Sequence, residues 1–541
     1  MKRLLLITLA LAFCGGAFAQ QNEEKKPSRG YLTGSFETNT IYYMDDEKSN
    51  AVAPDDHIGS NNYLKLDYYH GKFSAGVQME AYLPVLLGYP NELEKAKLTN
   101  YYVRWTDERF SVTAGTFYDQ FGSGLLFRSW EDRTLGMNNA LMGARFTYNY
   151  ENIVGVKAIW GMPRFGMEFS DTQVRGIDLQ FSLSNLLKWQ HTTLAIEGSY
   201  LNRYEKLNAD LEEIGAKPYS NGYSGRLNFG YKGFSLKGEV VDGGEKHYLN
   251  PRFGQDGDMR SYLRKYGNAQ LVELSYNGHG LGINLAGRRL EWMNSPILQD
   301  NTSTSNLLNY VPAMSAQYTY LLMNLHPYSP QLGDVKIMNS GEIGGQVDLY
   351  YNFKRGTALG GKRGMKLHAN FSTYYTLHEE NTAKSGNMLY RNINVDLEKQ
   401  FTRKFKMYLL WAYQEYNPSY GENKTTNLAN IFVADLTYKW TPDFSTRLEL
   451  QYLTTFEDHK DWMAALLEIN FAPHWSIYGS DMYNHGDTKT HYYNAGVSYT
   501  RSRTRIALSY GRNKAGYVCS GGVCRTMPAY TGGNLAITIA F

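Results

Sequence analysis

The sequence has little of what a soluble multidomain protein or a helical membrane protein needs. Of its 541 residues only 15 are proline and 3 are cysteine, and no Pro-rich, Ser-rich or charge-block linker divides it. After the first twenty residues, no apolar run approaches the roughly 18 to 20 residues that a membrane helix requires. The formal net charge is only +3, so a basic nucleic-acid-binding surface is not indicated.

Aromatic residues and glycine are abundant instead. The chain has 45 Tyr, 24 Phe, 9 Trp and 52 Gly. Aromatic side chains favour strands, so the composition indicates an all-β protein. A soluble chain of this length would divide into several domains, and because no boundary between domains is visible, one continuous β architecture fits better.

The N-terminus has the parts of a secretory signal peptide. Lys2 and Arg3 form the positive region, residues 4–13 the apolar core, and residues 17–19 (Ala-Phe-Ala) the cleavage site. We therefore expect residues 1–19 to be a signal peptide, followed by a short segment at 20–29 and a single domain at 30–541. Removal of the two N-terminal cations lowers the net charge from +3 by two, to +1.

The three cysteines fall into two groups. Cys14 raises a lipoprotein alternative, although the bulky Phe13 before it matches a lipobox poorly. Cys519 and Cys524 are the pair that remains after export, and they are candidates for a disulfide that closes a small loop. No His flanks this pair, and the twelve His residues show no ligand spacing, so we expect no metal site and no cofactor.

Apolar and polar residues alternate with a period of two along the whole mature sequence, which is typical of strands with one apolar and one polar face. Near the end of the chain, Leu535, Ile537 and Ile539 share one face, with small or polar residues between them. Lys, Arg, Asp and Glu fall on one side of each strand only. Because the pattern continues over some 500 residues, it indicates one large sheet.

Short and long connections also alternate. Eleven turns and eight long joins are visible, and the eleven hairpins together with an opening and a closing strand predict 24 strands, within a range of 20 to 26. The turns lie near Gly71, Glu108, Glu151, Leu187, Lys232, Gly278, Thr402, Pro442, Pro473 and Ser502 and across 355–363, and the joins are 45–60, 119–139, 163–174, 205–221, 242–269, 294–341, 417–426 and 511–530. Residues 307–325 are either an inward-folded loop or a further strand pair.

These features predict that residues 30–541 form a transmembrane antiparallel up-and-down β-barrel in the bacterial outer membrane, with residues 20–29 as a short periplasmic segment. Lipid offers no partner to free backbone groups, so a chain without apolar helices crosses only as a closed sheet. Too few residues precede the first strand for a plug domain. The expected partners are outer-membrane lipid and the barrel assembly machinery, which typically recognises a terminal aromatic residue such as Phe541.

Two groups of residues are candidates for function. Charged residues on the polar strand faces are expected to line the pore and to set selectivity, and charged residues of the 119–139 loop are candidates for a constriction. The same loop charges also fit a loop that ion pairs merely pin to the wall. The pore-lining candidates are Lys65, Asp67, Arg104, Arg226, Asp435, Lys439, Arg447 and Glu449, and the loop candidates are Arg128, Glu131, Asp132 and Arg133.

The loop also carries a family resemblance. The stretch 124–133 (Gly-Leu-Leu-Phe-Arg-Ser-Trp-Glu-Asp-Arg), followed by 138–145 (Asn-Asn-Ala-Leu-Met-Gly-Ala-Arg), resembles a stretch in an uncharacterised family of Bacteroidota outer-membrane β-barrel proteins. The resemblance covers most of the mature chain. It implies location and fold, and it carries no catalytic residue across.

The function hypothesis is a porin-like passive channel for hydrophilic solutes. The alternative is a platform that transports nothing and whose long Tyr-rich loops bind a secretion or surface-attachment partner, because Tyr offers a large contact area at low entropic cost. An enzyme is not expected. His474 and Ser476 are the nearest approach to a nucleophile and its base, and they lack an evident acidic partner.

Overall fold

The computed structural model describes residues 30–249, 262–298, 306–333, 339–377 and 386–541. The predicted segments 1–19 and 20–29, and parts of the 242–269 and 294–341 joins, lie outside these residues. Within them, 24 strands form one antiparallel sheet that closes when the last strand pairs with the first. The predictions of an all-β closed barrel and of 24 strands are confirmed. The absence of a plug domain before the first strand concerns residues 1–29, which the structure does not describe. It stays a prediction.

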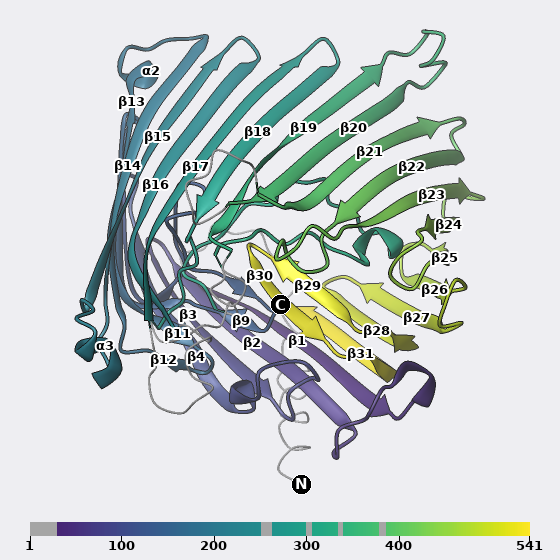
Figure 1. The fold of residues 1–541 in the computed structure, drawn as a ribbon, viewed down its shortest axis with the longest axis horizontal. Coiled ribbons are helices and arrows are strands. Elements are labelled where there is room, and N and C mark those ends of the chain that lie inside the picture. Colours follow the sequence, from purple (N-terminus) through teal and green to yellow (C-terminus); the bar gives the residue numbers. More distant parts are fainter. Residues whose placement is uncertain (1–29, 250–261, 299–305, 334–338, 378–385) are drawn as a thin grey trace.

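The strands run up and down around the wall in sequence order (Figure 1). The wall strands are β1 (Tyr31–Met44), β2 (Ile58–His70), β3 (Phe73–Tyr82), β4 (Ala96–Thr106), β5 (Phe110–Phe117), β10 (Leu141–Tyr150), β11 (Val154–Phe165), β13 (Gln173–Ser182), β14 (Thr192–Tyr204), β15 (Tyr219–Tyr231), β16 (Phe234–Leu249), β17 (Tyr262–Gly278), β18 (Leu281–Glu291), β19 (Gly341–Phe353), β20 (Met365–Thr376), β21 (Met388–Gln400), β22 (Phe405–Tyr416), β23 (Asn427–Lys439), β24 (Phe444–Thr454), β25 (Trp462–Phe471), β26 (Trp475–Asn484), β27 (His491–Arg501), β28 (Thr504–Asn513) and β31 (Tyr530–Ala540).

The remaining elements are short and lie in the connections. They are β6 (Gln120–Phe121), β7 (Phe127–Arg128), β8 (Glu131–Asp132), β9 (Met137–Asn138), β12 (Glu168–Phe169), β29 (Gly516–Ser520), β30 (Val523–Met527), α2 (Leu183–Leu186), α3 (Ala209–Glu213) and the 3-10 turns Glu47–Ser49, Asn91–Leu93 and Leu322–Asn324. Among the described residues, no helix has the length and apolar character to cross a membrane.

All eleven predicted turns join consecutive wall strands at one rim, where the chain also enters β1 and leaves β31. The long connections lie at the other rim. The sequence did not predict the connections 83–95, 377–387, 455–461 and 485–490 as long joins. In the first of these, Leu83 and Val85 continue the apolar pattern of β3, so the alternation does not show where the strand ends.

The two faces of the wall differ as the alternation predicts. In β24, Leu450 is 46% exposed on the outside, whereas Glu449 is 4% exposed on the inside. The first and last strands are joined by backbone hydrogen bonds as well: the N–H of Gly34 donates to the carbonyl of Phe541 (2.8 Å), and the N–H of Phe541 donates to the carbonyl of Gly34 (2.9 Å). Closure therefore pairs the backbone all round and leaves an apolar outer surface and a polar inner one.

Candidate functional site

Three long connections fold into the barrel and pack against one another. We call them the constriction loop (residues 118–140), the strap (306–333) and the tip hairpin (514–529, which contains β29 and β30). Figure 1 shows the tip hairpin inside the ring of wall strands. The largest apolar cluster of the protein lies here and unites Phe127 of the constriction loop, Leu308 of the strap and Val523 of the tip hairpin with inward wall residues such as Leu290.

The constriction loop is tied to the wall at its base. The buried carboxylate of Asp119 lies 2.5 Å from Nε of Arg145 on β10 and 3.1 Å from Nζ of Lys157 on β11. Farther along, the N–H of Ser123 donates to Oε2 of Glu239 on β16 (3.1 Å). Three wall strands thus fix the entry of the loop into the lumen.

The four predicted loop charges do not form a single network. The guanidinium of Arg133 pairs with Glu131 at 3.0 Å and with Glu37 of β1 at 2.5 Å. Asp132 instead accepts hydrogen bonds from the N–H groups of residues 134 and 135. Arg128 stacks 3.9 Å over the ring of Tyr310 in the strap. Pinning by ion pairs, the simpler interpretation of these charges, describes Arg133 and Glu131 well.

The strap is held near both of its ends by a buried ion pair of the wall. Nε of Arg288 on β18 donates to Oε1 of Glu342 on β19 (2.8 Å), and both side chains are at most 1% exposed. The strap hydrogen-bonds to this pair at three points. Arg288 donates to the carbonyl of residue 312, the N–H of Gln331 donates to Oε2 of Glu342 (2.8 Å), and the hydroxyl of Tyr328 donates to the same oxygen. Burial raises the pKa of Tyr328 well above its ordinary value, which keeps it a donor.

Between these contacts the strap crosses the inner wall towards β25. The hydroxyl of Tyr318 donates to Asp396 on β21 (3.0 Å), and the N–H of Leu322 donates to Gln451 on β24 (2.9 Å). Leu322 also packs into a second apolar cluster, which includes Ile431 and Trp462 on the inner face of the wall. Of the two alternatives for residues 307–325, the inward-folded loop is therefore the one observed.

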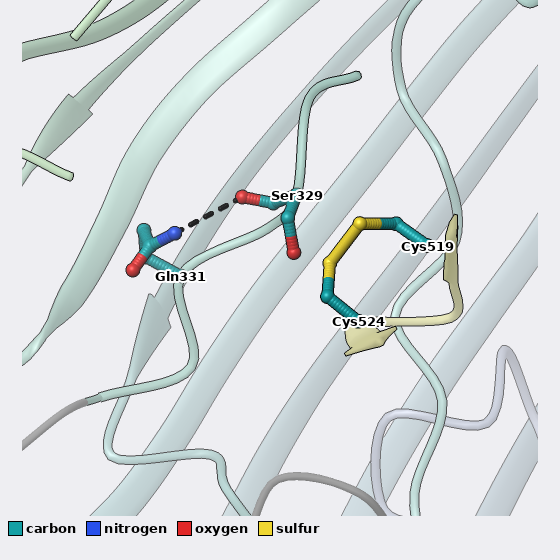
Figure 2. The surroundings of a disulfide bond; sticks show 4 residues. All are labelled: Ser329, Gln331, Cys519 and Cys524. Atoms are coloured by element: carbon teal, nitrogen blue, oxygen red, sulfur yellow. Dashed lines mark hydrogen bonds between the residues drawn. A yellow bond between two sulfur atoms is a disulfide. The ribbon is translucent and has the colours of Figure 1, made fainter. Parts of the chain in front are cut away.

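The tip hairpin reaches the strap with its turn. Gly521 and Gly522 have φ of +59° and +89°, and a Cβ at Gly521 would overlap the ring of Tyr310. Cys519 and Cys524 form a disulfide across the two strands. Figure 2 shows this disulfide beside Ser329 and Gln331 of the strap, where Nε2 of Gln331 donates to the carbonyl of Ser329 (3.1 Å).

The predicted pore-lining residues of the first half of the chain face inward in separate clusters. Nζ of Lys65 lies 3.3 Å from Asp67. Arg104 donates to the hydroxyl of a threonine on β5 (3.0 Å). Arg226 is buried and pairs with Glu197 (2.7 Å) and with an aspartate of β13. These cations are engaged by neighbouring wall groups.

The predicted residues on β23 and β24 come together. The guanidinium of Arg447 lies 2.9 Å from Asp435 and 2.6 Å from Glu449. Lys439 lies on the same face of β23 at its exposed short-turn end. The structure thus places cations and carboxylates next to one another on this part of the inner wall.

Sequence reasoning missed two buried ion pairs and one histidine. Besides Arg288 with Glu342, both guanidinium nitrogens of Arg164 donate to the carboxylate of Glu80 (2.7 Å each). His368 on β20 lies between two carboxylates of neighbouring strands, with Nε2 at 2.6 Å from Asp348. Alternation places most of these groups inward, but pairing across strands depends on register, which the sequence alone does not give.

Cavities remain between the inward segments and the wall. One, of about 390 Å³, lies between the strap and β19 to β22, and another, of about 350 Å³, lies beside Ser123 and β14 to β17. A third, of about 490 Å³, opens among the long connections and is lined by five tyrosines, Tyr328, Tyr390, Tyr416, Tyr420 and Tyr517. The described residues contain no group of three His, Cys, Asp or Glu side chains arranged to hold a metal ion.

The chain belongs to the Family of unknown function (DUF6029), whose model matches residues 1–541. No curated protein matches it. Among solved structures it is similar to the P pilus usher (PapC) translocation pore, with a TM-score of 0.45 and 9% identity over 94% of this chain and 99% of that one. It is also similar to the siderophore receptor PirA from Pseudomonas aeruginosa (TM-score 0.43, 9% identity, 96% and 81% covered) and to a mutant of Rh. blastica porin (0.28, 10%, 65% and 100%). All three TM-scores are below 0.5, so we assign no property of these proteins to this chain.

Proposed function

We propose that this DUF6029 member is a passive channel of the bacterial outer membrane for hydrophilic solutes, and that its inward-folded segments restrict the passage. One observation carries the proposal: cavities of about 390 and 350 Å³ lie between the strap or the constriction loop and a polar, charged inner wall. The apolar outer face suits outer-membrane lipid, and Phe541 at the closing strand suits recognition by the barrel assembly machinery. The Bacteroidota origin stays a prediction, and no catalytic residue enters the proposal.

The size of the wall explains why inward segments are needed. At about 4.8 Å between strands and a tilt of about 40°, 24 strands enclose a ring with a diameter of about 48 Å between backbones if it is circular. An unobstructed lumen of that size would pass folded proteins and destroy the barrier. The strap and the constriction loop divide it into narrower passages.

Single-channel recording in planar bilayers tests the proposal. We expect discrete conductance steps from the full-length protein, and larger steps when residues 306–333 are replaced by a short Gly-Ser linker. The matched control replaces residues 206–217, the connection that contains α3 at the barrel rim, and should leave the steps unchanged. Absence of conductance from both the full-length protein and the strap deletion would refute the channel.

A second candidate is a platform that binds a partner at the long-connection rim. The cavity of about 490 Å³ favours it, because five tyrosines from five different segments converge there, and such surfaces suit recognition. If the protein is a platform, the strap deletion should abolish capture of a partner and the bilayer should show no steps. A channel gives the opposite pair of results.

A further inference from the structure

The tip hairpin carries positive charge into the lumen. Residues 514–529 contain two cations, Lys514 and Arg525, and no Asp or Glu. Neither cation lies within ion-pair distance of a carboxylate among the described residues. Each donates to backbone carbonyls instead. The tip hairpin therefore has two positive charges that no neighbouring side chain neutralises.

Arg525 is held in a defined position. Its guanidinium stacks 3.8 Å over the ring of Tyr89 in the connection 83–95. The hydroxyl of Tyr89 donates in turn to the carbonyl of Arg133 in the constriction loop (2.9 Å). Gly136 of the same loop has a φ of +61°, and a Cβ there would lie only 2.8 Å from Nη1 of Arg525. The connection and the constriction loop together therefore fix the side chain of Arg525.

Arg525 lines a cavity of about 440 Å³ between the tip hairpin, the constriction loop and the connection 83–95. Two further arginines line this cavity, and both have carboxylate partners. Arg133 pairs with Glu131 at 3.0 Å. Arg164 pairs with Glu80 at 2.7 Å. Of the three guanidinium groups, that of Arg525 is the one whose charge is available to a solute.

The rest of the lining suits an apolar group. It includes Tyr89, Leu93, Leu135, Met137 and Phe165. The volume lies within the range of about 300 to 1,000 Å³ found for small-molecule sites. Two carboxylates line the cavity: Glu131 is the one held by Arg133, and Glu92 is exposed to solvent, which screens its charge. An anion can therefore approach Arg525 without displacing an existing ion pair.

The guanidinium of Arg525 has donors left for such an anion. A guanidinium carries five N–H groups, and three atoms of this one donate to carbonyls, Nε and Nη2 to Gly88 and Nη1 to Leu135. Two N–H groups remain, and a planar guanidinium matches a carboxylate in geometry and charge. Burial lowers the pKa of Arg525 to about 10, so the group is still a cation at neutral pH.

We propose that this cavity binds a small organic carboxylate, with the carboxylate on Arg525 and an apolar body against the aromatic and aliphatic lining. The proposal rests on the proposed channel function, because it names the class of solute that the channel selects. Lys514, the second cation of the tip hairpin, lines the cavity of about 490 Å³. Positive charge in a narrow passage raises the local concentration of anions, so both cavities favour the same class of solute.

Calorimetric titration of the full-length protein in detergent tests the site. The probes are phenylacetate, which has a carboxylate and a ring, and phenylacetamide, which has the same shape without the charge. We expect saturable binding of phenylacetate and at least tenfold weaker binding of phenylacetamide. Arg525→Gln should weaken the binding of phenylacetate about tenfold or more, as for the loss of a hydrogen bond to a charged group.

The matched control is Arg109→Gln. Arg109 also stacks on a tyrosine, Tyr150 (5.4 Å), but it lies in the turn between β4 and β5 at the opposite rim. This variant loses the same charge and should bind phenylacetate as the wild type does. An equal loss of binding in Arg109→Gln and Arg525→Gln would show a general effect of net charge and would overturn the site.

Arg525→Lys separates a binding role from a structural one. Lysine keeps the positive charge, whereas glutamine keeps only hydrogen-bond donors. If Arg525 merely ties the tip hairpin to backbone carbonyls, the two variants should bind phenylacetate equally. If it binds the carboxylate, Arg525→Lys should bind more tightly than Arg525→Gln, while limited proteolysis shows the tip hairpin equally protected in both variants.

The remaining outcomes distinguish failure of the site from failure of the channel. Equal affinity for phenylacetate and phenylacetamide, or no binding of phenylacetate by a protein that conducts KCl, overturns the carboxylate site and leaves the channel in place. Binding of phenylacetate that depends on Arg525, in a protein that shows no conductance, keeps the site and refutes the channel.

Discussion

The wall pair Arg288 and Glu342 offers the sharpest test of how the strap is held. Glu342→Gln preserves the shape of the side chain but removes its charge, and it leaves a buried guanidinium that is 1% exposed without a counter-ion. Breaking a buried pair on one side costs roughly 3 to 5 kcal/mol. The same carboxylate also accepts hydrogen bonds from Tyr328 and from the N–H of Gln331. The substitution therefore weakens the contact between the strap and the wall as well as the ion pair within the wall.

The assay combines thermal unfolding with limited proteolysis of the strap. We expect a lower Tm for Glu342→Gln and rapid cleavage within residues 306–333. The control is the double variant Arg288→Met with Glu342→Leu, which removes both charges; replacing a buried pair by apolar residues is often neutral, so its Tm should return towards that of the wild type. If Glu342→Gln matches the wild type in both measurements, the pair does not hold the strap.

Three further predictions concern the other fastenings. Asp119→Asn removes the carboxylate shared by two wall cations that are 22% and 35% exposed; because solvent reaches both cations, we expect a loss of roughly 1 to 3 kcal/mol and noisier single-channel currents, and an unchanged current would show that other contacts hold the loop. The bond between Cys519 and Cys524 closes a loop with a sequence separation of 5, worth about 2 kcal/mol in the chain-entropy relation; reduction should speed proteolysis of the tip hairpin with the barrel Tm unchanged, and equal cleavage rates would contradict this. His326 in the strap lies 2.9 Å from Asp458, and its hydrogen bond lowers the pKa of the Asp458 carboxyl well below the ordinary value. The stabilisation by this carboxylate is therefore present above about pH 4 and is lost only at lower pH. Hydrogen exchange in the strap of the wild type should stay slow down to about pH 4, and at neutral pH it should be fast only in Asp458→Asn.

The wall could be predicted from the sequence because its rule is local. Alternation at period two and short turns such as those at Gly71 and Lys232 require no knowledge of distant residues, so strand number, direction and inner face follow. The inward segments obey no such rule. The strap is fastened by Arg288, Asp396 and Gln451, which lie on three strands far apart in sequence, and such contacts follow only from the closed register.

One local signal does mark where the strap lies, and it is a failure of the alternation. In β23, Ile431 and Val433 face the lumen, where a water-filled barrel calls for polar residues, while Phe432 faces outward. The strand is apolar on both faces over this stretch, as strands covered on both sides are. Leu322 of the strap covers the inner side. An apolar inward face in the middle of a barrel strand therefore indicates chain inside the lumen.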